Sequence, residues 1–226
     1  MATTYDKIDN YVDAIVSYLN DHYASEIATL TTTTIPYINY IPVGGYEGKP
    51  TFDMMYKTLD SWIRTNIRDA YNFSRGKKNE LEVDYLDIEI SAKYILFTLF
   101  VPFVLSRVME DYHNNQREIN SWGTWKTKNS KWEIVNCSAN SASMIFWLDK
   151  QYGYGKKLRI FLRYPRIDDF KKYSKLSMSD FITQVKLNAI IYYDNGNSRH
   201  SQTMTLEDFK WDRMSTILAP YARIIL

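Results

Sequence analysis

The residues able to take part in acid–base or metal chemistry are few and widely spaced. The chain has three histidines, His22, His113 and His200, and no pair has the i, i+4 spacing of a helical zinc site. Met109-Glu-Asp-Tyr-His113 brings two carboxylates near an imidazole, a combination that can transfer protons. The same residues are ordinary at the solvated end of a helix. We therefore expect no catalytic site, no metal and no cofactor.

Motifs that bind phosphate or activate a nucleophile are also missing. The sequence contains neither of the common Gly-rich phosphate loops nor a Gly-x-Ser-x-Gly elbow, and Gly153-Tyr-Gly155 is too short a fragment for a nucleotide site. The one cysteine, Cys137, excludes an internal disulfide and a multi-cysteine metal site in this chain. Its surroundings, Trp132-Glu-Ile-Val-Asn-Cys137, predict a small buried strand residue. These observations favour a protein that is not an enzyme.

Charge is the more informative pattern, because acidic and basic residues gather in separate segments. The first segment, residues 80–89, is acidic, and the second, residues 156–175, is basic. The members are Glu80, Glu82, Asp84, Asp87 and Glu89 in the acidic segment, and Lys156, Lys157, Arg159, Arg163, Arg166, Lys171, Lys172 and Lys175 in the basic one.

These two segments allow three interpretations. They can be solvated outer faces, or faces that pair within one sheet. They can meet between copies of the chain in a head-to-tail contact, which closes into a ring when the rotation permits. The basic segment can also bind single-stranded nucleic acid, with Tyr152, Tyr154 and Tyr164 stacking on bases. A net charge of only +2 favours an acidic protein partner over nucleic acid.

Length fits one large domain or two small ones, and the order of helix and strand patterns predicts a single α+β domain, with an α-rich part in residues 1–120 and a β-rich part in residues 131–226. The 226 residues are 45% apolar and 15% aromatic, enough for a sizeable core. The N-terminus has no basic stretch followed by an apolar one, so we expect no secretion signal and synthesis in a cytosol. The most apolar window, residues 94–105, contains Pro102 and falls short of the roughly 20 residues of a membrane span. We expect it in the core and no membrane contact.

The N-terminal half is predicted to contain amphipathic helices and an extended arm. Apolar residues at spacings of three or four predict a helix over residues 5–29 and a second helix from Thr51. Between them, residues 35–50 are rich in proline and glycine and carry Tyr37, Tyr40 and Tyr46, so we expect an arm that packs on a partner. Alternation predicts a strand over residues 81–90. The next apolar run, to residue 105, suits a strand or a helix, and we favour a helix from about Pro102.

The C-terminal half is predicted to form an antiparallel sheet from about residue 131. One hairpin joins residues 144–148 to 158–164 through Gly153 and Gly155, and another joins residues 181–193 to the segment after Asn195-Gly196. Thr205-Leu-Glu-Asp208 resembles a capping box and predicts a helix to about residue 218. Because Pro220 should stop that helix, the tail to Leu226 is expected to dock as a strand.

In its overall order the chain resembles the neck, ring and tail-completion proteins of tailed bacteriophages, including those of the crAss-like group. The features concerned are the leading amphipathic helix, the arm Tyr37-Ile-Asn-Tyr-Ile-Pro-Val-Gly-Gly-Tyr46, the hairpin-rich second half and the tail Pro220-Tyr-Ala-Arg-Ile-Ile-Leu226. The resemblance implies a virion protein made in the host cytoplasm. It implies rings of identical subunits between portal and tail, around the DNA channel, with neighbouring portal or tail proteins as partners. The resemblance assigns no functional role to any single residue of this chain.

Overall fold

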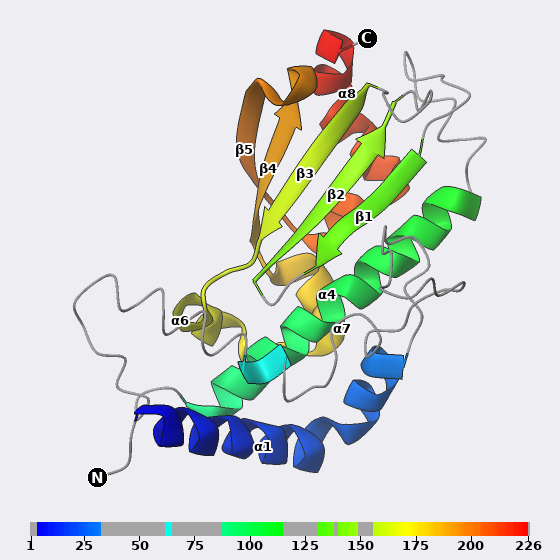
Figure 1. The fold of residues 1–226 in the computed structure, drawn as a ribbon. Helices are drawn as coiled ribbons and strands as arrows, with labels where there is room; N and C mark the ends of the chain where they lie inside the picture. Colours follow the sequence, from blue (N-terminus) through cyan, green and yellow to red (C-terminus); the bar gives the residue numbers. More distant parts are fainter. Residues whose placement is uncertain are drawn as a thin grey trace, which may run out of the picture.

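The computed structural model describes residues 4–32, 62–64, 87–114, 131–137, 140–148 and 156–225. Two long helices come first, an antiparallel sheet follows, and a helix ends the chain (Figure 1). This is the α+β order predicted from the sequence. The arm at residues 35–50 and most of the predicted second helix lie outside the described residues, although Trp62, Ile63 and Arg64 are helical.

Helix α1, Thr4–Thr32, confirms the helix predicted over residues 5–29. Its buried stripe includes Val12, Ile15 and Leu19, the i, i+3, i+7 spacing of one helical face, and that face packs against α4. The helix bends at Tyr23, where φ is −138° and ψ is 25°. After the bend the buried positions resume at Ile27 and Leu30.

Helix α4, Ile88–Asn114, is the centre of the core. The prediction of a strand up to residue 90 is wrong at its end, because Asp87 starts a helix there. The Asp87 Oδ1 atom accepts hydrogen bonds from the backbone N–H groups of Glu89 at 2.8 Å and Ile90 at 3.3 Å. A helix N-terminus needs such acceptors for its free N–H groups, and they fix the helical start more strongly than a short alternation favours a strand.

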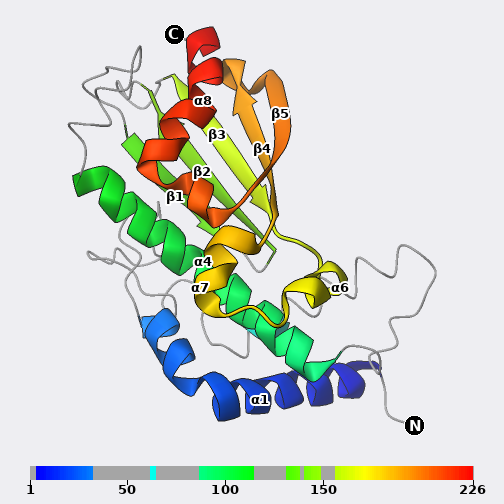
Figure 2. The same ribbon diagram turned by 180° about the vertical axis from the view of Figure 1, so that it is seen from behind.

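The apolar run of residues 91–105 is helical throughout, so the expected helix start near Pro102 is also wrong. Pro102 lies inside α4 and is buried. The stretch Ile88–Val108 is long and apolar enough to cross a membrane, but most of it is buried inside the protein. Helix α1, the sheet and the other helices cover it, as expected for a core helix (Figures 1 and 2).

The sheet has five antiparallel strands in sequence order. They are β1 Lys131–Cys137, β2 Ser141–Trp147, β3 Lys157–Arg163, β4 Leu187–Tyr193 and β5 Ser198–Met204. Both predicted pairings are confirmed, β2 with β3 and β4 with β5. In the second hairpin, positive φ angles at Asp194, Asn195 and Gly196 reverse the chain, as the Asn-Gly sequence predicted. The connection around Gly153 lies outside the described residues.

Short helices fill the connection between β3 and β4. They are α6 Ile167–Phe170, η3 Lys171–Tyr173 and α7 Met178–Gln184. The strand expected from residue 181 begins only at Leu187, because Ser177 and Asp180 form a capping box that starts α7. Phe181 therefore points into the core, with its ring centroid 5.6 Å from that of Phe97.

The last helix extends further than predicted. The capping box of Thr205 and Asp208 is present and starts the short helix η5, Leu206–Phe209, which α8, Trp211–Ile225, follows. Pro220 lies inside α8 and is exposed, so the hydrogen bond it removes falls on the solvent side. The tail is helical rather than a strand, and Tyr221 packs with its ring centroid 5.0 Å from that of Tyr193.

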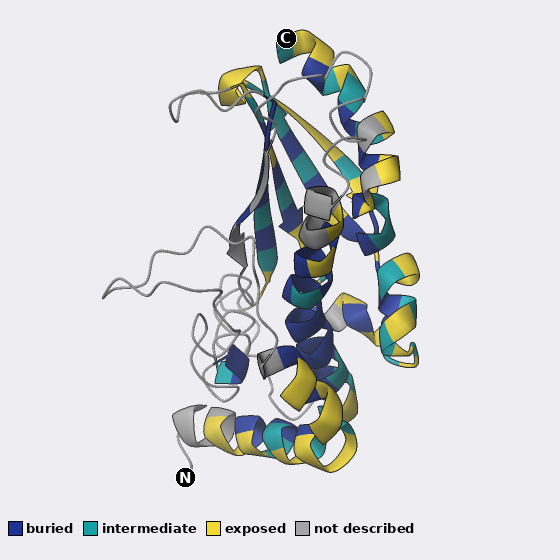
Figure 3. Ribbon diagram, turned by 90° about the vertical axis from the view of Figure 1, so that its right-hand side faces the viewer, coloured by how far each residue is buried: buried dark blue, intermediate teal, exposed yellow. Residues whose placement is uncertain are grey.

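Helices α4, α7 and α8 lie on one side of the sheet, whereas α1 lies beyond one end of it (Figures 1 and 3). Figure 2 shows α7 and α8 in front of the strands when the protein is seen from behind, whereas the strands face the viewer in Figure 1. The inner side of the sheet, the helices and the segment around Trp62 share one hydrophobic core. The opposite side of the sheet is not covered by any described helix.

Candidate functional site

Strand β3 separates apolar from basic residues through its period of two. Leu158, Ile160 and Leu162 are completely buried against the helices. The intervening side chains point to the opposite side, and Arg159 and Arg163 are exposed there. The strand is thus both a core element and the source of a basic surface.

The strand register brings aromatic residues between these cations. Arg159 lies opposite Tyr192 on β4, and Tyr192 lies opposite Arg199 on β5. One step along the strands, Phe161 lies opposite Ile190. Directly opposite residues have Cβ atoms about 4.5–5.5 Å apart, so Tyr192 stands between two arginine side chains.

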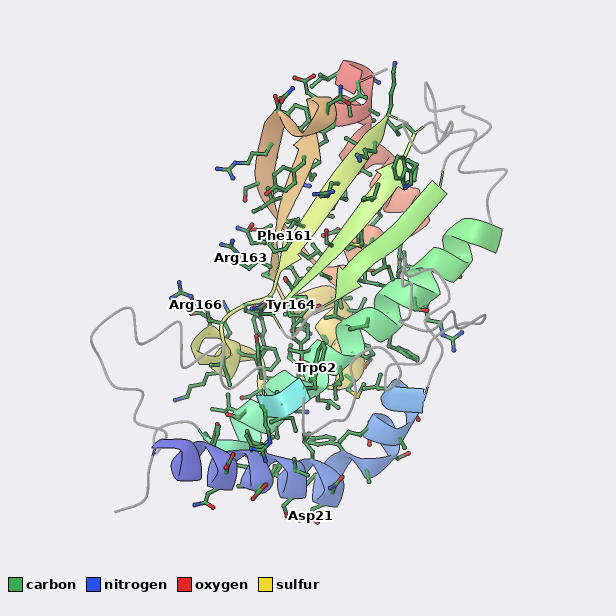
Figure 4. All side chains as sticks on the ribbon, viewed as in Figure 1. Asp21, Trp62, Phe161, Arg163, Tyr164 and Arg166 are labelled. Carbon is green, nitrogen blue, oxygen red and sulfur yellow. The ribbon has the colours of Figure 1, made fainter. Side chains whose placement is uncertain are left out.

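We define the outer face of β3–β5 by the outward residues of these strands. They are Lys157, Arg159, Phe161, Arg163, Asn188, Ile190, Tyr192, Arg199, Ser201 and Thr203. This set contains no aspartate and no glutamate. Its arginines are exposed, and its aromatic residues, Phe161 and Tyr192, are half-buried. Figure 4 shows Arg163 and Arg166 projecting away from the protein on the same side.

The arginines of this face have no carboxylate partner within the described part of the chain. Ion pairs do form elsewhere: Arg213 on α8 lies 3.4 Å from a Glu207 oxygen and 3.5 Å from an Asp208 oxygen. No such contact is present at Arg159, Arg163 or Arg199 in the described ranges. The face therefore carries net positive charge that the described structure does not neutralise.

The accessible surface ends at β2. On the same side of the sheet, Ile145 and Trp147 are only 7% and 8% exposed. The Lys157 Nζ atom lies 5.0 Å from the centroid of the Trp147 ring, a cation–π distance. Lys157 is thus partly engaged, and the exposed cations are concentrated on β3 and β5.

The structure gathers only part of the predicted interface. Lys157, Arg159 and Arg163 share the outer face of β3–β5, and the exposed residues Lys156 and Arg166 flank β3. Asp87 is exposed but caps the start of α4, which lies near α1 and away from the strands (Figure 1). The other predicted interface residues lie outside the described ranges: Tyr37, Tyr40, Tyr46 and Asp84.

The aromatic residues of the outer face differ from those predicted. Tyr164 is 4% exposed and packs with its ring centroid 5.6 Å from that of Phe97, so it is not available to stack on a base. Tyr152 and Tyr154 lie outside the described residues. Phe161 and Tyr192 were missed, although both alternate with buried apolar neighbours. That alternation is the signal by which they can be found.

A second charged surface, also missed, lies on α1. Its exposed side carries Asp9, Asp13, Asp21 and Glu26, and residues 8–32 contain no lysine or arginine. Arg64 forms an ion pair with Asp9 and lies 3.9 Å from an Asp13 oxygen. Asp21 and Glu26 have no such partner in the described structure. Figure 4 shows Asp21 at the end of the protein away from the sheet.

The histidines do not form a reaction centre in the part of the chain that the structure describes. His22 is exposed, with Nδ1 2.9 Å from the Tyr18 carbonyl oxygen. His200 is also exposed and lies 5.9 Å from the Tyr221 ring. The side chain of His113 is not described. Within the same ranges no three His, Cys, Asp or Glu side chains gather as metal ligands do.

Comparison with protein-family models, with curated proteins and with solved structures gives no match to this chain.

Proposed function

We propose that this protein is a non-enzymatic assembly protein of a tailed-phage virion, a ring subunit of the head-to-tail connector or tail. It acts by binding other protein subunits. The observation that carries this proposal is the outer face of β3–β5, where exposed arginines surround half-buried aromatic residues without a carboxylate.

The composition of this face is that of a protein interface. Arginine, tyrosine and phenylalanine are enriched in the centres of interfaces, where aspartate and glutamate are depleted. Arg159, Tyr192 and Arg199 provide such a centre in one row across the sheet. Arginine forms bidentate contacts with carboxylates, so an acidic partner surface would satisfy the charges left open here.

The face is also well suited to docking because it is preformed. Strands β3 and β4 are each hydrogen-bonded to a neighbouring strand on both sides. The other side of the sheet packs on the hydrophobic core. A surface that needs little ordering loses less conformational entropy on binding. The preformed face therefore favours binding of another subunit.

The virion setting rests on the resemblance of the overall order to phage neck and ring proteins. The leading amphipathic helix and the hairpin-rich second half are present, whereas the apolar tail is the end of a helix. Ring formation, the neighbouring portal or tail proteins and a place beside the DNA channel all belong to this proposal.

A second candidate function is binding of single-stranded nucleic acid. The observation in its favour is the diagonal placement of Phe161 and Tyr192 on neighbouring strands, about 7–8 Å apart, with arginines on either side. Two such rings can each stack on a base while the arginines contact phosphates. The same face thus suits either an acidic protein or a nucleic acid.

Sedimentation of wild-type protein with and without a single-stranded DNA oligonucleotide separates these functions. An assembly protein should form oligomers without DNA, and excess oligonucleotide should leave them intact. The variant Arg159→Glu with Arg163→Glu should then sediment more slowly. Wild-type protein that stays monomeric alone and sediments faster only with DNA would refute the proposal.

A further inference from the structure

We propose that the acidic side of α1 in one copy binds the outer face of β3–β5 in the next copy, in a head-to-tail contact. This inference rests on the proposed function and names the partner surface. The occupant is a second copy of this chain, and the observation that selects it is the charge complementarity of two surfaces of one molecule.

The acidic side of α1 is formed by carboxylates opposite the buried stripe. Asp9, Asp13 and Asp21 repeat at multiples of four residues, so they lie on the half of the helix that faces away from Ile15 and Leu19. Glu26 lies after the bend at Tyr23 and is also exposed. Figure 3 shows exposed residues along the outward side of α1.

Arg64 neutralises only the first part of this side. It contacts Asp9 and Asp13, whereas Asp21 and Glu26 are exposed without an ion pair in the described structure. A basic partner surface would therefore form new ion pairs mainly with the second half of α1. The exposed carboxylates on α1 and the exposed guanidinium groups on β3 and β5 have opposite charges, so they can form ion pairs with one another.

The two surfaces cannot meet within one copy. Helix α1 lies at one end of the molecule, packed against α4, and the sheet lies at the other end in both Figure 1 and Figure 2. Each copy thus presents an acidic surface and a basic surface simultaneously. Such an arrangement favours contact between copies.

Charge also determines which surfaces of two copies can meet. A two-fold contact of sheet with sheet would place arginines against arginines, and a contact of α1 with α1 would place carboxylates against carboxylates. Only the unlike pair is attractive, so the contact joins different surfaces of the two copies. Made in one direction, contacts of this kind close into a ring or continue as a filament, and made reciprocally they give a two-fold dimer.

The dimensions of the two surfaces are compatible. Strands are about 4.7–4.9 Å apart, so the axes of β3 and β5 are about 10 Å apart. An α-helix with side chains is about 10–12 Å in diameter. One helix laid along this part of the sheet covers the row of Arg159, Tyr192 and Arg199.

This surface replaces the acidic segment predicted from the sequence. Asp84 lies outside the described residues, and the Asp87 carboxylate accepts hydrogen bonds from the start of α4. Asp21 and Glu26 have no comparable engagement in the described structure. They are the better candidates for the partners of Arg159 and Arg163.

A charge-swap experiment on the full chain tests the contact. One variant carries Arg159→Glu and Arg163→Glu, and the other carries Asp21→Lys and Glu26→Lys. In each variant alone, like charges face one another. The dissociation constant for self-association, measured by sedimentation velocity at low salt, should therefore rise by roughly tenfold or more. In an equimolar mixture both contacts become complementary again, and association should return in complexes that alternate the two variants.

The control variants change charges outside both surfaces. Lys171→Glu with Lys175→Glu alters exposed cations between β3 and β4, and Asp169→Lys alters an exposed carboxylate on α6. These proteins should self-associate as the wild type does, and thermal melting should confirm that every variant is folded. Combining both reversals in one chain should also restore self-association.

The outcomes distinguish this inference from the proposed function. Association of the wild type without rescue in the mixture or in the combined variant would overturn the α1 contact and leave protein binding by the sheet intact. A wild type that never associates, but loses retention of single-stranded DNA when Arg159 and Arg163 are reversed, would overturn both.

Discussion

Arg159 on β3 lies directly opposite Tyr192 on β4, on the side of the sheet that no described helix covers. Arg199 on β5 lies opposite the same tyrosine from the other side. A half-buried ring between exposed guanidinium groups packs beside its strand neighbours and keeps area available for a partner. This row is the centre of the interface that we propose.

Replacing Tyr192 by alanine should weaken self-association without unfolding the protein. The ring supplies apolar area at the centre of the outer face, and truncating a central aromatic residue in an interface typically costs about 2 kcal/mol or more. Sedimentation equilibrium measures the change. Tyr192→Phe, which keeps the ring, should behave almost as the wild type. If Tyr192→Ala associates normally and is folded, the row does not form the centre of the interface.

The stability of the protein should depend on Phe97 much more than on Phe103. Phe97 is completely buried, with ring centroids 5.3 Å from Phe170 and 5.6 Å from Phe181, whereas Phe103 is half-buried. Phe97→Ala should lower the free energy of unfolding by about 3–5 kcal/mol because it leaves a cavity. Chemical denaturation measures both variants. A loss at Phe103→Ala as large as at Phe97→Ala would contradict the described core.

The capping box at Thr205 should contribute measurably to stability. The Thr205 backbone N–H donates to Asp208 Oδ2 at 2.8 Å, and the box starts the helical segment that leads into α8. Thr205→Ala should lower the free energy of unfolding by about 1 kcal/mol, whereas Thr205→Ser, which keeps the hydroxyl, should cost much less. Equal losses in the two variants would show that the hydroxyl is not the cause.

Tyr11 should make stability fall at high pH. Burial raises the pKa of Tyr11 from 10.0 to about 12, with a smaller contribution from the Asp87 charge, while its hydrogen bond with Ser91 acts in the opposite direction. Below pH 10 the folded and unfolded states both hold the proton, so this contribution is complete. Between pH 10 and about 12 the unfolded state loses the proton first, so stability decreases with pH.

The size of this effect follows from the pKa difference and is at most about 2–3 kcal/mol. Comparing urea unfolding of the wild type and Tyr11→Phe across that pH range isolates it from the titration of other tyrosines. The variant should be less stable at neutral pH, because it removes the buried hydrogen bond with Ser91, and its stability should fall less steeply above pH 10. If the free energies of unfolding of the two proteins fall equally steeply with pH, the pKa of Tyr11 is not raised.

Periodicity predicted the parts of the fold that depend on local sequence. The buried stripe of α1 and the alternation of β3 follow from apolar spacing, and the second hairpin follows from Asn195-Gly196. The first and last residues of helices were harder to predict, because they depend on single residues. Asp87 caps α4 inside a short alternating stretch, and Pro220 is tolerated within α8 on its exposed side.

The candidate site was only partly predictable. Tyr164 has the same parity as Leu162, so alternation places it in the core, where it cannot stack on a base. The row of Arg159, Tyr192 and Arg199 depends on the register of β3 with β4. Because a long connection joins β3 to β4, tertiary packing sets their register, and no local sequence pattern reveals it.

The most direct test of protein binding by the outer face is the native mass of nuclease-treated wild-type protein at low and at high salt. Unlike charges hold the proposed contact, and salt screens them, so the mass should be that of an oligomer at low salt and should decrease at high salt. A mass equal to one 26.7 kDa chain at low salt, with no nucleic acid present, would contradict the account.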